Sequence, residues 1–171
     1  MSNGKVTLRA ASEQDLSQLN DIYNRYVLET HFTFDVEPMT LEDRQAWFTH
    51  YNTTGPHRVV VGVSDAALVG YACSSRWRPK AAYETSVETS IYVAPDAVGR
   101  GVGSRLYEEL FKQLQGEDVH RAYAGIALPN LASIALHERF GFKRAGHFTE
   151  QGRKFDRYWD VSWYEKAMGA A

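Results

Sequence analysis

The chain has 171 residues, enough for one domain that buries most of its apolar surface, so we expect a single domain over residues 1–171. Apolar residues make up 44% of the chain and charged residues 23%, a balance typical of a folded protein rather than of a disordered one. The net charge of −2 shows no basic excess, so nucleic acid is not an expected partner.

The first part of the chain predicts one short strand and two helices. The strand is expected at Val6–Arg9, and Ser12 followed by Asp15 resembles a capping box at the start of the first helix. Thr40 and Asp43 repeat this pattern before the second helix. The apolar face of the first helix carries Leu16, Leu19, Ile22, Tyr23, Tyr26 and Val27, and the second helix carries Leu41, Trp47, Phe48 and Tyr51.

The segment between these helices, His31–Thr40, has mixed polarity and a proline, which predicts a loop. It contains two phenylalanines, Phe32 and Phe34. They either pack the loop onto the core or line a pocket, and the residues themselves favour neither interpretation.

Two apolar segments then predict a hairpin, at His57–Val63 and Ala67–Ser74, with turn residues between them. The following segment, Ser75–Tyr83, has the sequence SRWRPKAAY, with three cations and two aromatic residues around a proline. A surface loop of this composition is usually only solvated. Because it leads directly into the next strand, we also consider it as a contact for a substrate anion.

The central segment, Thr85–Leu114, predicts a strand rich in β-branched residues, a glycine-rich loop and an amphipathic helix. The loop residues GRGVGS, at 99–104, offer backbone N–H groups at a helix N-terminus, which suits a phosphate. The loop has neither the GK[ST] ending of a P-loop nor the third glycine of a dinucleotide fingerprint, so a tight turn is the competing interpretation. Glu88 is an isolated carboxylate within the strand.

The last part of the chain predicts a strand at Val119–Ala127 and a helix that Asn130 caps and Gly141 ends. Two final strands are expected at Phe142–Phe148 and Tyr158–Tyr164, with a polar, glycine-containing loop between them. The resulting order of elements is β-α-α-β-β-β-α-β-α-β-β. It predicts an α/β domain built around one mixed sheet.

A single cysteine, Cys73, excludes an internal disulfide framework and is typical of a reducing compartment. It lies in the apolar segment YACSS, which favours a buried small side chain over a thiol that carries an acyl group. Residues Met1–Leu16 hold no apolar core of signal-peptide length, and no window approaches about 18 apolar residues. We therefore expect a cytoplasmic protein that makes no contact with a membrane.

The segments ETSIYVAPDAVGRGVGSRLYEEL and ALPNLASIALHERFGF together resemble the GNAT superfamily of acetyl-CoA-dependent N-acetyltransferases. Within it, the chain resembles the phosphinothricin and methionine sulfoximine acetyltransferases, through FDVEP at Phe34–Pro38, the spacing of Trp77, Ala82 and Tyr83, the VETSIYV strand and LHERFGF. The resemblance extends from Val6 to Tyr164. It implies an α/β (α+β) GNAT fold, with a mixed sheet of six to seven strands flanked by about four helices.

The resemblance also implies acetyl-CoA as the co-substrate. In this superfamily the strand that matches Ile91–Val93 binds the pantetheine arm through its backbone, and the glycine loop wraps the pyrophosphate. The first position of the usual Q/R-x-x-G-x-G/A motif is Val98 here, which removes a polar side chain but leaves the amides that bind the anion. The implied cofactor-binding residues are Ile91, Tyr92, Val93, Gly99, Arg100, Gly101, Val102, Gly103, Ser104, Asn130 and Ser133.

Glu88 matches the general base of the family. Burial among apolar neighbours would raise its pKa toward values useful for taking a proton from an amine, directly or through a water. The alternative is a structural glutamate paired with Arg76, Arg78 or Lys80.

His137 stands where many members of the superfamily have a tyrosine that protonates the leaving thiolate. An imidazole can donate a proton near neutrality, but a histidine that only packs near the thioester is an equally open interpretation. Tyr92 and Tyr107 are weaker candidates, and the N–H of Val93 is the implied oxyanion donor. We predict no metal, because no metal-ligand spacing is found among His31, His50, His57, His120 and His147.

For the acceptor, the predicted binding residues are Phe34, Arg76, Trp77, Arg78 and Tyr83, with the cations holding a carboxylate or phosphinate and the rings covering an aliphatic chain. The implied reaction is acetylation of the α-amine of phosphinothricin, methionine sulfoximine or methionine sulfone, an activity that confers herbicide resistance. The alternatives are another amine (a polyamine, an aminoglycoside or a protein N-terminus) and a non-catalytic acyl-CoA sensor. The aromatic residues of the terminal strands fit either a homodimer contact or an ordinary core, and we favour the homodimer; they are Tyr158, Trp159, Trp163 and Tyr164.

Overall fold

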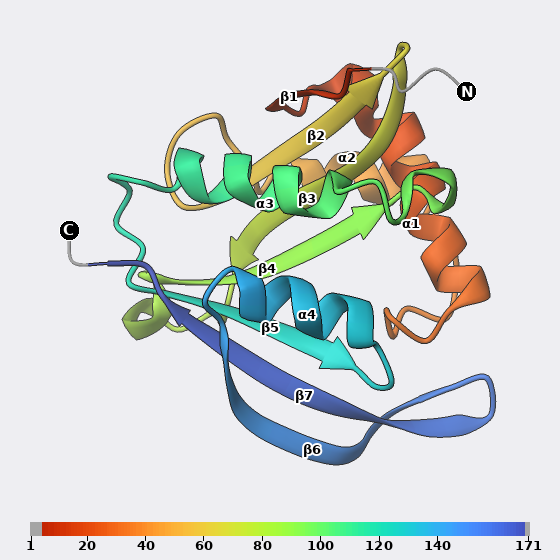
Figure 1. Cartoon of the computed structure of the whole chain (residues 1–171), viewed down its shortest axis with the longest axis vertical. Helices are drawn as coiled ribbons and strands as arrows, with labels where there is room; N and C mark the ends of the chain where they lie inside the picture. The colour runs from red at the N-terminus through yellow and green to blue at the C-terminus, as the bar shows by residue number, and fades with distance from the viewer. Residues whose placement is uncertain (1–4, 170–171) are drawn as a thin grey trace.

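The computed structural model describes residues 5–169, which form one seven-stranded sheet with helices on both faces (Figure 1). The strands are β1 (Thr7–Ala10), β2 (Arg58–Ser64), β3 (Ala67–Arg76), β4 (Ser86–Val93), β5 (Arg121–Ala127), β6 (Lys143–Lys154) and β7 (Arg157–Ala167). The helices are α1 (Leu16–Glu29), α2 (Leu41–Phe48), α3 (Val102–Gln113) and α4 (Leu131–Arg139). The order of elements and the mixed sheet predicted from the sequence are confirmed.

The strand order across the sheet is β1-β2-β3-β4-β5-β7-β6, and every neighbouring pair is antiparallel except β4 and β5. The parallel pair is short, because only Ser86–Glu88 is in register with Arg121–Tyr123. Both strands continue beyond that register, to Val93 and Ala127. The sheet therefore opens between β4 and β5 immediately after Glu88.

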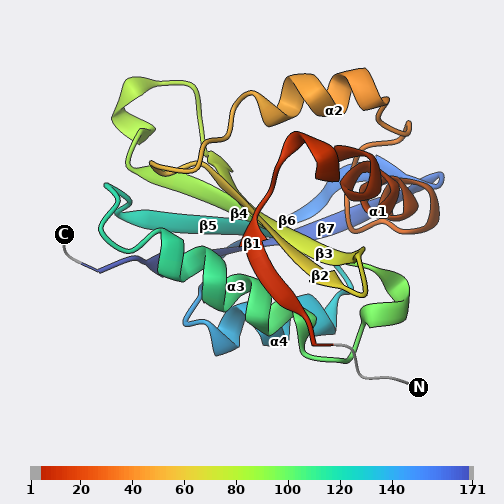
Figure 2. The ribbon, with the colours of Figure 1, turned by 90° about the horizontal axis from the view of Figure 1, so that it is seen from above.

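Helices α1 and α2 cover one face of the sheet, and α3 and α4 cover the other (Figure 2). The apolar face of α3 is fully buried, with Leu106, Tyr107 and Leu110 each at 0% exposure. The core also contains Val60 and Val61 of β2 and the buried side of α1. Among residues 5–169, no helix combines the length and hydropathy that a membrane span requires.

The helix ends follow the capping signals of the sequence. The Thr40 hydroxyl accepts the N–H of Asp43 at 3.1 Å, and the Asn130 side chain accepts the N–H of Ser133 at 3.1 Å. Gly141 follows α4 with φ of 82°, the left-handed conformation that favours glycine. These local interactions fix where α2 and α4 begin and where the chain turns back into the sheet.

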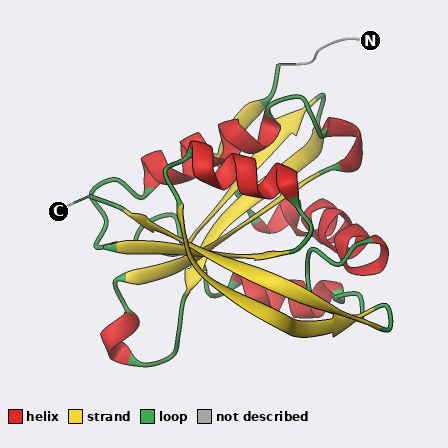
Figure 3. Cartoon of the chain, turned by 60° about the horizontal axis from the view of Figure 1, so that its bottom comes forward, coloured by secondary structure: helices red, strands yellow, loops and turns green. Residues whose placement is uncertain are grey.

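The prediction of a loop between Phe148 and Tyr158 is wrong. Most of this segment belongs to β6, which forms one long hairpin with β7 at the edge of the sheet (Figure 3). The turn is only two residues, Phe155 and Asp156, both with positive φ, as in the tight turns that suit hairpins. Register shifts lie between Arg144 and Gly146 and between Phe148 and Gly152. These bulges break the alternation of apolar and polar residues, which explains why the sequence pattern indicated a loop.

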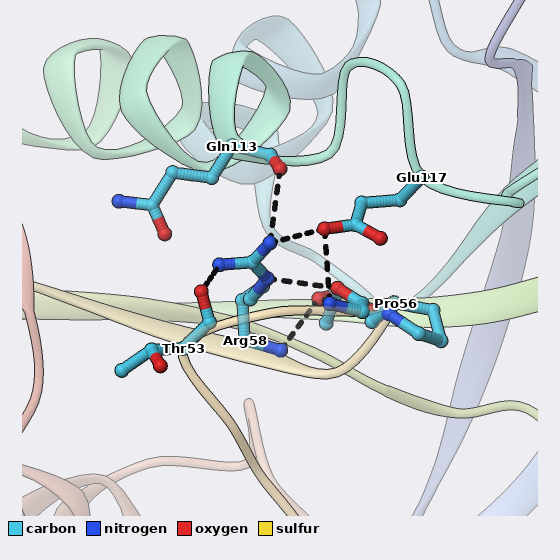
Figure 4. A network of polar contacts seen from close by, with 7 residues as sticks. Thr53, Pro56, Arg58, Gln113 and Glu117 are labelled. Carbon is cyan, nitrogen blue, oxygen red and sulfur yellow. Dashed lines mark hydrogen bonds and ion pairs between the residues drawn. The ribbon is translucent and has the colours of Figure 1, made fainter.

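Away from the gap, the buried Arg58 connects the segment before β2 to the end of α3 (Figure 4). Its guanidinium pairs with Glu117 and donates to the carbonyls of Thr53 and Gly55, the latter at 2.8 Å. The Glu117 carboxylate also accepts the N–H of Gly55, at 2.9 Å. The positive charge of Arg58 and the negative charge of Glu117 therefore neutralise each other.

Candidate active site

Two cavities meet at the gap between β4 and β5, and they are reached from opposite faces of the sheet. The larger, about 490 Å³, extends over the glycine loop and α4, and we call it the α4-side cavity. The smaller, about 310 Å³, lies on the face that carries Glu88, beneath the loop after α1, and we call it the Glu88-side cavity. Both cavities are lined by Phe32, Ser90, Tyr92, Gly125 and Ala127.

The α4-side cavity contains ten of the eleven predicted cofactor-binding residues. It is lined by Ile91, Tyr92, Val93, Gly99, Gly101, Val102, Gly103, Ser104, Asn130 and Ser133, and also by His137. Arg100 is exposed on the loop outside this lining. The cavity is also lined by residues that the sequence did not assign to cofactor binding, namely Tyr26, Thr89, Ala97, Val98, Ile126, Ala132, Ala135, Leu136 and Arg139.

The glycine loop brings backbone rather than side chains to this cavity. Gly99 and Gly101 have φ of 80° and 75°, and a Cβ added at either residue would meet nothing within 4 Å. Open space therefore lies beside the loop, directly before the N-terminus of α3, where free N–H groups and the helix dipole favour an anion. Gly103 serves packing instead, because a Cβ there would lie 3.3 Å from Leu136 Cδ2 of α4.

The backbone of β4 presents two of the three predicted strand residues to the gap. The N–H of Ala94 donates to the carbonyl of Val69, a residue of β3, at 2.9 Å. Since successive residues of a strand direct their amides to opposite edges, Tyr92 also faces β3, whereas Ile91 and Val93 face the gap. In the free protein the Tyr26 hydroxyl donates to the Val93 carbonyl at 2.7 Å and accepts the Val93 N–H at 3.3 Å.

Glu88 lies where the gap begins, opposite Ser75 of β3 and Tyr123 of β5. Its half-buried side chain lines the Glu88-side cavity, and no described residue donates a hydrogen bond to its carboxylate or forms an ion pair with it. Burial raises the pKa of Glu88, and the nearby charge of Arg78 partly opposes this shift. The carboxylate is therefore unpaired among the described residues, and it lies two residues before Ser90, which lines both cavities.

His137 is 3% exposed, and both of its ring nitrogens have partners. Nδ1 lies 2.7 Å from the Ser133 carbonyl, which can only accept, so Nδ1 carries the proton. Nε2 lies 2.8 Å from the Tyr107 hydroxyl, which donates to it when the imidazole is neutral. Burial lowers the pKa of His137, so this neutral form dominates near pH 7.

The predicted acceptor residues separate into two groups. Phe34 lines the Glu88-side cavity together with Phe32, which answers the question that the sequence left open. Trp77 stacks on Tyr123 with ring centroids 4.6 Å apart, and the Arg78 guanidinium lies over the Trp77 ring. Arg76 donates to the carbonyls of Arg78 and Pro79, and Tyr83 is exposed. The structure therefore does not bring Arg76, Trp77, Arg78 or Tyr83 into the cavity lining.

Most of the remaining wall of this cavity comes from the α1–α2 loop and from strands β4 to β7. The sequence analysis did not assign these wall residues to acceptor binding. These residues are Thr33, Ser90, Gly125, Ala127, Gln151, Val161 and Trp163. Gly125 pairs with Trp163 and Ala127 with Val161 because β7 inserts between β5 and β6. Alternation along each strand could have indicated which residues share a face, but not that β7 lies beside β5.

Cys73 is 4% exposed, and burial raises the pKa of its thiol to about 11. This environment agrees with the predicted structural role rather than with an acyl carrier. Among residues 5–169, no group of three or more His, Cys, Asp or Glu side chains could hold a metal ion.

A sheet that separates between two parallel strands, with a glycine loop on one side and an unpaired carboxylate on the other, suits the transfer of a group from a phosphate-bearing donor to an acceptor. The family model described as an acetyltransferase (GNAT) domain matches residues 8–163, so the chain belongs to the GNAT acetyltransferase family and is an N-acetyltransferase.

Among its relatives, a phosphinothricin N-acetyltransferase of Streptomyces coelicolor is 54% identical, over 96% of this chain and 97% of that protein. An L-methionine sulfoximine/L-methionine sulfone acetyltransferase of Pseudomonas paraeruginosa is 33% identical, over 94% and 93%. The crystal structure of a phosphinothricin acetyltransferase from Sinorhizobium meliloti in complex with acetyl-CoA superposes with a TM-score of 0.89 at 31% identity, covering 96% of this chain and 89% of that one.

Proposed function

We propose that this enzyme transfers the acetyl group of acetyl-CoA to the α-amine of a small amino-acid analogue such as phosphinothricin, methionine sulfoximine or methionine sulfone. The observation that carries the proposal is the unpaired Glu88 carboxylate in a cavity that adjoins, through the gap between β4 and β5, a second cavity on the opposite face of the sheet. The names of the Streptomyces and Pseudomonas relatives support the acceptor class.

Acetyl-CoA would supply an activated acyl group as a thioester, held in the α4-side cavity. The amides of the glycine loop and of the α3 N-terminus would bind its phosphates. The gap-facing backbone of Ile91 and Val93 would bind the pantetheine arm, and Asn130 and Ser133 line the same passage. This assignment places the reacting carbonyl near Ser90 and Tyr92, which both cavities share.

Glu88 is the proposed general base. An amine that enters from the Glu88-side cavity as an ammonium must lose a proton before its lone pair can attack the thioester carbon. The desolvated carboxylate accepts that proton, directly or through one water. The C–N bond then forms to give a tetrahedral oxyanion, and the C–S bond breaks as the carbonyl re-forms, releasing the thiolate of CoA. The backbone N–H of Val93 is the proposed oxyanion donor, and in the free protein the Tyr26 hydroxyl is its acceptor.

His137 is the proposed acid that protonates the leaving thiolate, a role that requires the imidazolium form, because in the neutral ring the only N–H, on Nδ1, donates to the Ser133 carbonyl. Its contacts with Tyr107 and Ser133 form a buried polar chain along the wall of the α4-side cavity. We expect His137→Ala to lower kcat more than the affinity for acetyl-CoA, which a thiol-release assay and calorimetry would separate. Equal losses in both quantities would indicate that the side chain only packs.

The cationic loop remains our proposal for the outer part of the acceptor site. Arg78 already acts on the pKa of Glu88, so its charge reaches the Glu88-side cavity, and Arg76, Trp77 and Tyr83 accompany it. A cationic loop also disfavours polyamine and aminoglycoside acceptors.

We further propose that the protein is cytoplasmic and forms a homodimer. The dimer is proposed because Phe148, Phe155 and Tyr158 expose more than half of their surface on the β6–β7 hairpin. Sedimentation would test the dimer.

The test of the proposed function is thiol release from acetyl-CoA with a panel of amines. The panel contains phosphinothricin, methionine sulfoximine, methionine sulfone, spermidine, kanamycin and a peptide N-terminus. We expect turnover on the first three alone. Turnover only on the others would refute the acceptor class, and acetyl-CoA binding without any turnover would favour a sensor.

A further inference from the structure

The β6–β7 hairpin holds the loop after α1 at three points. The His31 ring stacks on Trp159, with centroids 3.9 Å apart and an interplanar angle of 7°. The Lys154 ammonium donates to the Thr33 carbonyl at 2.8 Å, and Lys154 is only 3% exposed. The third point is the Phe34 ring, which lies against Gly152. Because Phe32, Thr33 and Phe34 line the Glu88-side cavity, the hairpin positions one of its walls.

The contact between Phe34 and Gly152 leaves no space for a side chain on β6. A Cβ built on Gly152 would lie 2.2 Å from Phe34 Cε2, 2.4 Å from Cδ2 and 2.7 Å from Cζ. Gly152 is outside the set of residues with positive φ, so its backbone conformation is open to any residue. The glycine is therefore required by the position of the Phe34 ring and by nothing in its own backbone.

We propose that Gly152 is a specificity-determining residue for the acceptor amine. By leaving room for the Phe34 ring against β6, it sets the width of the Glu88-side cavity and so selects which side chains fit beside Glu88. Its neighbour Gln151 lines the same cavity, so a shift of β6 would be transmitted there as well. The inference rests on the proposed function, in which this cavity receives the acceptor.

A residue larger than glycine at position 152 must displace the Phe34 ring, since the backbone of a paired strand cannot retreat by more than a fraction of the overlap. Gly152 is in register with Trp159 of β7, and Trp159 is itself fixed by the stack with His31. The ring is the only mobile partner, and its displacement changes the wall of the cavity. The α4-side cavity contains neither residue, so acetyl-CoA binding should not respond.

The experiment is a double-mutant cycle with Gly152→Ala, Phe34→Ala and the double variant, using wild-type turnover on the best amine of the panel as the reference. Gly146→Ala is the matched control, because Gly146 lies on the same strand and an added Cβ would meet nothing within 4 Å. We measure kcat/KM for that amine and for a smaller α-amino acid, together with the affinity for acetyl-CoA.

We expect Gly152→Ala to lower kcat/KM for the best amine by about tenfold or more, mainly through KM, with the smaller amino acid affected less. Acetyl-CoA affinity and Gly146→Ala should both stay within about twofold of wild type. In the Phe34→Ala background the added methyl has space, so the double variant should match Phe34→Ala alone.

Equal loss from Gly152→Ala in both backgrounds, or no change in either, would overturn the proposal. If Gly152→Ala folds poorly, the comparison of Phe34→Ala with the double variant still decides, because a further tenfold loss there contradicts the inference. A wild-type enzyme that turns over no amine of the panel would refute the proposed function instead, before any variant is made.

Discussion

Glu88 and Glu117 are both partly buried glutamates, and their surroundings differ in one respect. Glu117 accepts the Arg58 guanidinium and the N–H of Gly55, so its charge is neutralised and hydrogen-bonded (Figure 4). Glu88 accepts no hydrogen bond from the described residues, and burial raises its pKa. When a buried carboxylate has partners, removing one of them destabilises the fold, whereas a buried carboxylate without partners is destabilised as an anion and takes up a proton readily.

This contrast suggests different roles for two regions of the molecule, the end of α3 and the gap between β4 and β5. At the end of α3, the polar network joins a loop to a helix, and its groups satisfy one another. At the gap between β4 and β5, the carboxylate lines a cavity, where the proposed reaction would place the acceptor amine. Substitutions in the two regions should therefore change different quantities.

The largest effect is expected at Glu88. Glu88→Gln keeps the size of the side chain but cannot accept a proton, so we expect turnover to fall by about a hundredfold or more near neutral pH. Acetyl-CoA affinity should stay near that of the wild type. Steady-state kinetics and calorimetry measure the two effects, and Glu84→Gln, at an exposed residue just before β4, is the control. An unchanged rate would remove Glu88 as the base.

The raised pKa of Glu88 is expected to have opposite consequences for the activity and the stability of the wild-type protein as the pH changes. The base must be deprotonated, so wild-type turnover should decline as the pH falls through the raised pKa of Glu88. A raised carboxyl pKa means that the folded protein binds this proton more tightly than the unfolded chain, so the ionised side chain destabilises the fold above that pKa. Glu88→Gln should therefore unfold at a higher temperature than wild type near pH 7, and the difference should vanish at acidic pH.

At the other end, Arg58→Met should change stability and leave the chemistry alone. The substitution removes the partner of Glu117, and we expect a loss of about 2 kcal/mol in the free energy of unfolding, reduced from the cost for a fully buried pair because Glu117 is partly exposed. Urea unfolding measures it. The double variant Arg58→Met/Glu117→Gln should recover part of the loss, while kcat of the folded fraction stays unchanged. A fall in kcat would contradict the division between the two regions.

Gly101→Val tests the anion-binding side of the gap. Both Gly101 and Gly116 have positive φ, at 75° and 85°, so valine at either position should destabilise the protein by a similar amount, about 1–2 kcal/mol. Only Gly101 lines the α4-side cavity. We expect Gly101→Val to weaken acetyl-CoA binding by about tenfold or more, and Gly116→Val to leave it unchanged. Equal affinities in the two variants would refute the role assigned to the glycine loop.

The smallest effect is expected at Tyr26. Its hydroxyl binds the Val93 N–H, which the proposal gives to the oxyanion, and the Val93 carbonyl, which the proposal gives to the pantetheine arm. Tyr26→Phe should lower the free energy of unfolding of the free protein by about 1 kcal/mol and strengthen acetyl-CoA binding by a few-fold, because no hydroxyl has to be displaced. Tyr23→Phe removes hydrogen bonds to Thr33 and Asp35 elsewhere on α1, and should destabilise without any gain in affinity. Weaker binding in Tyr26→Phe would show that the hydroxyl stays in place and contributes.

Much of the site could be predicted from the sequence because its signals are local. The spacing of glycines before α3, the isolated Glu88 and the cap at Asn130 each depend on residues a few positions apart. The resemblance to a family then gave these features a chemistry. The loop predicted at residues 149–157 failed for a local reason as well, since bulges near Gly146 and Gly152 interrupt the strand pattern.

The sequence by itself determined the order of the elements, the helix ends marked by caps, and the glycine loop before α3, because propensity, capping and glycine geometry act within one turn of chain. Only the tertiary structure decided that β7 lies between β5 and β6, which brings Trp163 and Val161 to the acceptor side. It also decided that Arg76 and Tyr83 lie outside the cavity lining and that Phe34 rests on Gly152, across more than a hundred residues of sequence. Such contacts follow from strand pairing and side-chain packing over long separations, which no periodicity in the sequence encodes.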